Sequence, residues 1–265
     1  MKSRWLILGF AAVLTAACGS SAVGCPSMTP CSAIFGQRPS GLVPVAMLFL
    51  LLGAGLLLPL VRMAWLLWSS SIVLSRLPRS DYAPELVRAI RRTGVERVDC
   101  VVSGEPVALC AGVLRPKILV SQDVAPLLRP AELDAVLLHE AHHARRRDPL
   151  RRAAWRAAAD VFFFLPLLDW VARRRLIVSE LAADRVALQQ VGRTPLAGAL
   201  WTLGSASGDV AGAAFGGAIG LRVAQLFGRP VVLEGPEPVV WACSATGVAL
   251  AAGVGVCLRQ MLLGL

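Results

Sequence analysis

The sequence carries little charge for its length. Charged residues make up 17% of the 265 residues and hydrophobic residues 56%, whereas a typical soluble domain has roughly 25% charged residues. Intrinsic disorder is excluded, because a disordered chain combines low hydrophobicity with high net charge. The apolar residues also gather in blocks rather than at the spaced positions of a soluble core. The composition therefore predicts a membrane protein.

Cysteine is too scarce for a disulfide-stabilised fold. The chain has seven cysteines, and a disulfide scaffold of this length would need more. Their spacings match no zinc ribbon. We interpret them as isolated thiols, with a Cys25–Cys31 bridge as the alternative if that loop faces an oxidising compartment.

Lysine is nearly absent, so the net charge of +10 comes from arginine. Of the 27 basic residues, 18 lie between Arg76 and Arg175. This cluster stands between hydrophobic segments, which is typical of a cytoplasmic loop under the positive-inside rule. A basic surface for nucleic acid is the alternative. We favour membrane orientation and expect no direct nucleic-acid partner.

Three apolar segments are long enough to cross a membrane. The first follows two basic residues and is densest at Trp5–Cys18; it is either a retained helix or a signal peptide. We favour a retained helix because about 20 residues are available. The second is Pro39–Val61, continued after Arg62 to Ser75, and the third is Val239–Leu258. Basic residues follow the second segment, so its C-terminal end is expected in the cytoplasm.

Two further segments are apolar but interrupted. The uncharged core of Trp155–Trp170 is only Val161–Leu168, too short for a hydrocarbon layer about 30 Å thick. It predicts an interfacial hairpin bent at Pro166. The stretch Gly204–Gly220 is rich in small residues and predicts a flexible connector.

The intervening region reads as a small α+β unit. Helical spacing covers Tyr82–Thr93, and short strands are expected within Arg97–Ser103 and Val107–Ser121. The predicted fold is α+β, mostly helical, with about three transmembrane helices. The predicted parts are an N-terminal transmembrane helix or signal anchor with a short extracytoplasmic loop (1–38), a second transmembrane segment (39–75), a cytoplasmic domain with the interfacial hairpin (76–230) and a C-terminal transmembrane helix (231–265).

The chemistry lies on a helix predicted to begin at Pro130. All three histidines of the chain occur in His139-Glu140-Ala141-His142-His143. The pattern His-Glu-x-x-His on a helix sets two imidazoles four residues apart on one face, so that both reach one zinc ion. Glu140 lies on the neighbouring flank, where it can act on a water. Surface histidines on a basic helix are the alternative; for His142 we favour a structural or supporting role.

A catalytic zinc needs a third protein ligand. No other histidine exists, and the best candidate is Glu180, with Asp184 one turn later to support a ligating imidazole. By spacing alone, the two carboxylates could equally belong to an ordinary charged helix face.

Three segments together resemble the BlaR/MecR-type integral-membrane zinc peptidases and, more distantly, the HtpX-type quality-control peptidases. They are Gly112–Val120, Leu137–Leu150 and Glu180–Asp184. The resemblance covers about residues 40 to 225. It implies a membrane-embedded zincin of the gluzincin type, with Zn²⁺ held by His139, His143 and Glu180. It further implies Glu140 as the general base, and Asp184 and Asp148 as supporting residues.

The resemblance also implies a function. We expect a membrane-bound zinc metalloendopeptidase, multi-pass in a bacterial-type cell membrane and in contact with its lipid, that cleaves a protein substrate at the cytoplasmic face. A winged-helix repressor or the chain itself is the expected substrate. General quality control of membrane proteins and a catalytically silent signalling component are the alternatives. The penicillin-binding sensor domain of such sensors is not expected here, because only seven residues follow Leu258. The only tyrosine, Tyr82, has no evident role, so no oxyanion-stabilising residue is assigned.

Overall fold

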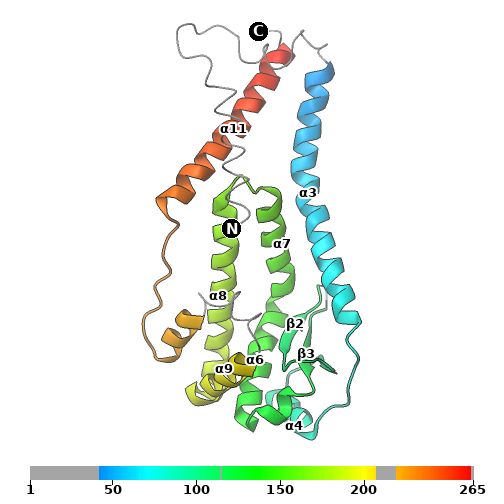
Figure 1. Ribbon diagram of the computed structural model, residues 1–265, viewed down its shortest axis with the longest axis vertical. Coiled ribbons are helices and arrows are strands. Elements are labelled where there is room, and N and C mark those ends of the chain that lie inside the picture. Colours follow the sequence, from blue (N-terminus) through cyan, green and yellow to red (C-terminus); the bar gives the residue numbers. More distant parts are fainter. Residues whose placement is uncertain (1–41, 114, 207–218, 264–265) are drawn as a thin grey trace. The chain divides into compact units, whose positions relative to one another are not determined.

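The computed structural model describes residues 42–113, 115–206 and 219–263 (Figure 1). Its elements are α3 (Leu42–Ser75), α4 (Pro84–Thr93), β1 (Val98–Val101), β2 (Ala108–Ala111), β3 (Lys117–Ser121), α5 (Val124–Leu127), α6 (Pro130–Arg146), α7 (Asp148–Val161), α8 (Pro166–Val191), α9 (Arg193–Ala206) and α11 (Pro238–Leu263). Residues 219–226 are also helical. The described chain is thus mostly helical with a small sheet, as the α+β prediction required.

The chain divides into two compact units. One contains Leu58–Phe163 and Leu167–Glu237, and the described part of the other contains the start of α3, Phe164–Pro166 and α11. The candidate catalytic residues all belong to the first unit.

The sheet has three strands in the order β1-β3-β2. β1 pairs with β3 in parallel, with Val98 opposite Ile118, and β2 pairs with β3 antiparallel, with Leu109 opposite Leu119. The expected strands therefore form, but the region Val107–Ser121 supplies two of them: β3 in the middle of the sheet and β2 at one edge, with β1 at the other. The order could not be predicted, because the β1–β3 pairing is non-local.

A hydrophobic core joins this sheet to α4, α6 and α9. Leu86, Ile118, Leu137 and Leu196 are each no more than 2% exposed and belong to one cluster. Burial of side chains of this size stabilises the fold by roughly 1.5–3 kcal/mol each. Since Leu137 lies on the same helix as the histidines, the core holds that helix against the sheet.

Helix α6 begins and ends where its sequence directs. Pro130 occupies the first turn, and the Glu132 carboxylate accepts a hydrogen bond from the Arg129 backbone N–H at 2.9 Å, which satisfies one of the donors that a helix start leaves open. At the other end Arg147 adopts a left-handed conformation with φ of 53°, unusual for a residue other than glycine. This corner ends α6 and starts α7 at Asp148.

Helices α7 and α8 form a hairpin, seen as two neighbouring helices in Figure 1. The turn of the hairpin covers residues 162–165 and α8 begins at Pro166, so the chain turns directly before this proline; the interfacial position of the hairpin stays a prediction. The turn residues Phe164–Pro166 group with α11. There the Phe164 carbonyl lies so close to Gly247 that a side chain at this glycine would overlap it.

One helix of the described chain is long and apolar enough to cross a membrane, namely Phe49–Ser75 within α3. The predicted C-terminal span is helical as α11, of which Pro238–Val254 forms a shorter apolar helix. The predicted first span, Trp5–Cys18, lies outside the described residues. So does the middle of the predicted connector Gly204–Gly220, at 207–218, whereas its two described ends are helical and not flexible connector.

Candidate active site

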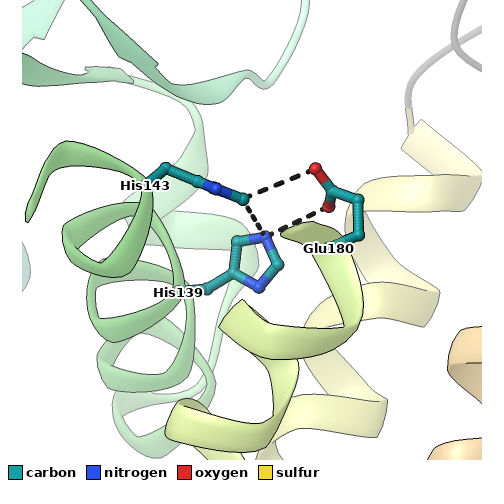
Figure 2. Close-up of side chains that lie close together, drawn as sticks. All are labelled: His139, His143 and Glu180. Carbon is teal, nitrogen blue, oxygen red and sulfur yellow. Dashed lines mark hydrogen bonds and ion pairs between the residues drawn. The ribbon is translucent and has the colours of Figure 1, made fainter. Parts of the chain in front are cut away.

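Helix α6 brings two imidazoles together. His139 and His143 are four residues apart and so share one helix face. Their Nε2 atoms lie 3.2 Å apart, and both side chains are buried (Figure 2). The two imidazoles meet because four residues make about one helical turn. They are buried because the apolar residues of α6 pack this helix into the core.

Helix α8 adds a carboxylate to this pair. Glu180 Oε2 lies 3.4 Å from His139 Nε2, and Glu180 Oε1 lies 3.5 Å from His143 Nε2 (Figure 2). A zinc ion with four ligands at about 2.0–2.1 Å would hold neighbouring donor atoms roughly 3.3–3.4 Å apart. Among the described residues, this trio is the group of histidine, cysteine and acidic side chains that could hold a metal. Two imidazoles and a carboxylate fit zinc in both spacing and donor type.

The outer nitrogens of both imidazoles face carboxylates. His139 Nδ1 lies 2.9 Å from Asp184 Oδ1, although its N–H is poorly aligned for a hydrogen bond. His143 Nδ1 lies 2.8 Å from Asp148 Oδ2. A carboxylate at Nδ1 keeps the ring proton on that nitrogen and leaves the Nε2 lone pair free. With zinc bound, both Nε2 lone pairs would point at the ion; in the metal-free protein a proton on His139 takes this place between the two imidazoles and Glu180.

The charges of the site agree with this arrangement. Burial alone would lower the pKa of His139, but Asp184 and Glu180 outweigh it and raise the pKa to about 9. Burial opposes the ionised carboxylates too, yet the contacts with His139 keep the pKa of both Glu180 and Asp184 below the usual range. His143 does the same for the pKa of Asp148. The site is a buried group of ionised carboxylates that attracts positive charge.

Glu140 lies on the flank of α6 beside the two imidazoles and lines a cleft together with His139, His143 and Glu180. Burial raises the pKa of its carboxyl group, and the nearby imidazoles only partly oppose the shift. A carboxylate with a raised pKa accepts a proton more readily near neutral pH. His142, in contrast, makes an edge contact with the His143 ring at 6.2 Å and does not join the trio.

Two arginines of the site were missed by the sequence reasoning. Arg222 donates two hydrogen bonds to Asp184, at 2.6 and 2.7 Å, and its Nη1 lies 3.4 Å from Glu180 Oε2. Arg152 donates a hydrogen bond of 2.6 Å to Glu180 Oε1. Neither arginine belongs to a motif or to a periodic pattern in the sequence. The one available clue was that Arg222 stands alone among apolar residues.

The trio opens into a cleft of about 520 Å³. Ala108, Leu109 and Cys110 of the edge strand β2 line one side, and Leu196, Leu200 and Leu203 of α9 line another. Such an apolar cleft with a few convergent polar groups is the usual form of a binding site.

The fold and the site define a class. A mostly helical α+β chain carries a buried His/His/Glu group of metal-binding type at the base of a cleft, as in metallopeptidases. A family model described as BlaR1 peptidase M56 matches residues 27–197. The match covers more than half of the chain, and the chain therefore belongs to this family of membrane-associated metallopeptidases. Searches of curated proteins and of solved structures gave no match.

Proposed function

We propose that the chain is a membrane-bound, zinc-dependent endopeptidase. The observation that carries the proposal is the convergence of His139, His143 and Glu180 at 3.2–3.5 Å, with Asp184 and Asp148 behind the two imidazoles. These three side chains would hold the zinc ion and the two aspartates would orient the imidazoles. When bound, zinc would polarise the scissile carbonyl and lower the pKa of a water molecule.

Glu140 is the general base in this proposal. Its carboxylate takes a proton from the attacking water and returns that proton to the leaving amine. Its raised pKa supports this role, since proton transfer in both directions is favoured when the pKa of the base approaches the working pH.

The substrate binds along β2. Because β2 lies at the edge of the sheet and lines the cleft, its free edge can pair with an extended peptide. The central strand β3 offers no free edge to a peptide. The apolar wall of α9 opposite β2 favours a substrate with apolar side chains around the scissile bond.

The site faces the cytoplasm and the chain crosses the membrane more than once in this proposal. Arg76 and Arg79 follow α3 directly, which supports a cytoplasmic position for its C-terminal end. The substrate is then a cytosolic or membrane-bound protein, and a winged-helix repressor in a signalling circuit, or the chain itself, is the substrate we propose.

The test compares membranes that carry the wild type with membranes that carry Glu140→Gln. We expect mass spectrometry to find new protein N-termini only with the wild type, and the proteins that carry them would identify the substrate. The variant should retain one zinc per chain because Glu140 is not a ligand. If both samples give the same N-termini while both bind zinc, the proposed chemistry is wrong and a silent signalling role is favoured. New N-termini spread over many damaged membrane proteins would instead indicate quality control.

A further inference from the structure

A second cavity, of about 780 Å³, lies between α7 and α8. Two aspartates, Asp148 and Asp169, line it together with six arginines. The lining therefore carries an excess of four positive charges. The arginines are Arg146, Arg151, Arg152, Arg156, Arg173 and Arg175.

Three of these guanidinium groups have a close carboxylate partner. Arg152 contacts Glu180, Arg156 contacts Asp160 and Arg173 contacts Asp169.

The other three are poorly compensated. Arg146 and Arg151 approach Asp148 Oδ1 only to 3.9 and 4.0 Å, and the other Asp148 oxygen already accepts hydrogen bonds from His143 and Ser179. For Arg175, no carboxylate of the described residues lies within ion-pair distance; its guanidinium stands 5.7 Å from the centre of the Trp155 ring. These three guanidinium groups can therefore bind an anion in the cavity.

The end of α7 lies beside the apolar helix α3. Arg62 of α3 donates two hydrogen bonds to Asp160, at 2.9 and 2.7 Å, and its guanidinium lies 4.6 Å from the centre of the Trp65 ring. We place the hydrocarbon layer over the uncharged part of α3, residues 42–61, rather than over the whole apolar helix Phe49–Ser75, because the latter contains Arg62. This uncharged part holds about 20 residues, roughly 30 Å, which equals the hydrocarbon thickness of a bilayer. Arg62 and Trp65 then fall at the headgroup layer, where arginine and tryptophan are favoured.

The cavity lies next to this level. Arg156 is four residues before Asp160, or about 6 Å along the helix, and Arg151 is about 14 Å away. The wall also includes Trp155 and Leu176, whose apolar surface suits the glycerol and the first carbons of an acyl chain. Positive charge, an aromatic wall and the headgroup level therefore occur together.

We propose that this cavity binds the phosphate headgroup of an anionic phospholipid. Arginine forks pair with phosphate oxygens through parallel hydrogen bonds, and basic residues near a membrane attract anionic lipid. The inner wall of the cavity includes Asp148 and Ser179, which contact His143, so the bound lipid would lie directly behind the imidazole of the metal-binding group.

The test titrates dioleoyl phosphatidylglycerol or dioleoyl phosphatidylcholine into the full-length, delipidated chain in an uncharged detergent, and native mass spectrometry counts the bound lipid. We expect the wild type to bind phosphatidylglycerol at least about tenfold more tightly than phosphatidylcholine, since one headgroup contacts several arginines at once. The variant Arg151→Gln/Arg175→Gln should bind phosphatidylglycerol about 30-fold more weakly, because each arginine near an anionic group contributes roughly fivefold. Neither residue contacts the candidate metal ligands.

The matched control is Arg145→Gln/Arg185→Gln, which removes two exposed arginines from α6 and α8 that do not line the cavity. It should bind phosphatidylglycerol within about twofold of the wild type, since net charge alone is not what the cavity recognises. Equal weakening in both variants, or no preference between the two lipids, would overturn the proposal. So would displacement of the lipid by an equal concentration of glycerol phosphate, which would assign the site to a free phosphate. Displacement by a glutamate-rich peptide would assign it to an acidic protein segment. Melting curves that match the wild type would show that both variants are folded.

Discussion

The contact between Asp184 and Arg222 gives the sharpest test of the site. Asp184 is fully buried and accepts two hydrogen bonds from Arg222, while its Oδ1 lies 2.9 Å from His139 Nδ1. Asp184→Asn removes the negative charge that faces both His139 and Arg222. We therefore expect this substitution to lower both the stability of the zinc-free protein and its affinity for zinc.

The two losses have different sizes and causes. Removal of one member of a buried ion pair costs roughly 3–5 kcal/mol. Arg222 retains Glu180 at 3.4 Å, so we expect a cost near the lower end, or a fall in melting temperature of about 6–12 °C. Loss of the carboxylate behind a ligating imidazole typically lowers metal affinity by about 10- to 100-fold. Melting curves in a chelator measure the first effect, and zinc competition with a chromophoric chelator measures the second.

Two comparison variants separate these causes. Asp184→Asn/Arg222→Met leaves no stranded guanidinium, so the zinc-free protein should regain most of its stability while zinc affinity stays low. Asp148→Asn removes the matching carboxylate at His143, where the nearest guanidinium groups are exposed and about 4 Å away. It should weaken zinc binding with a smaller loss of stability. A double variant that melts no higher than Asp184→Asn would contradict a stranded charge on Arg222, and so would an equal fall in melting temperature in Asp148→Asn.

Three further predictions concern other contacts. Glu180→Ala should lower bound zinc below one per chain by elemental analysis, and unchanged stoichiometry would remove Glu180 from the proposed ligands. Gly198→Val should cost roughly 1–3 kcal/mol by overpacking, because a side chain there would overlap the Glu132 carboxylate; Gly204→Ala, with open space around it, is the control. The pKa of His139, raised to about 9 from an unfolded value near 6.5, contributes stability that is fully present below about pH 6.5 and lost as the pH rises through about 9. The free energy of unfolding of the metal-free protein should therefore fall by on the order of 3 kcal/mol over this pH range, as measured by melting curves in a chelator. An unfolding free energy that does not change with pH would contradict the charge assigned to His139.

Local signals predicted much of the structure. Pro130 located the start of α6, and the four-residue spacing placed His139 and His143 on one face. Pro166 located the start of α8. Each of these features depends on residues that are close in the sequence, where helical geometry leaves few alternatives.

Contacts between distant segments could not be predicted in the same way. Arg222 reaches Asp184 across 38 residues and Arg62 reaches Asp160 across 98. A single arginine carries no period, so its partner is set by tertiary packing alone. The left-handed residue Arg147 was also unforeseen, because glycine or asparagine is the usual residue for such a corner.

The bidentate contact of Arg222 also sets a limit on how this chain can be shortened. The family match ends at residue 197, and a fragment cut there would keep every residue of the proposed zinc site. It would nevertheless lose the guanidinium that neutralises Asp184 and the buried core residue Leu226. Asp184 would then keep only His139 as a partner, and its buried carboxyl group would protonate more readily. The smallest fragment that reproduces the site must therefore extend past residue 226.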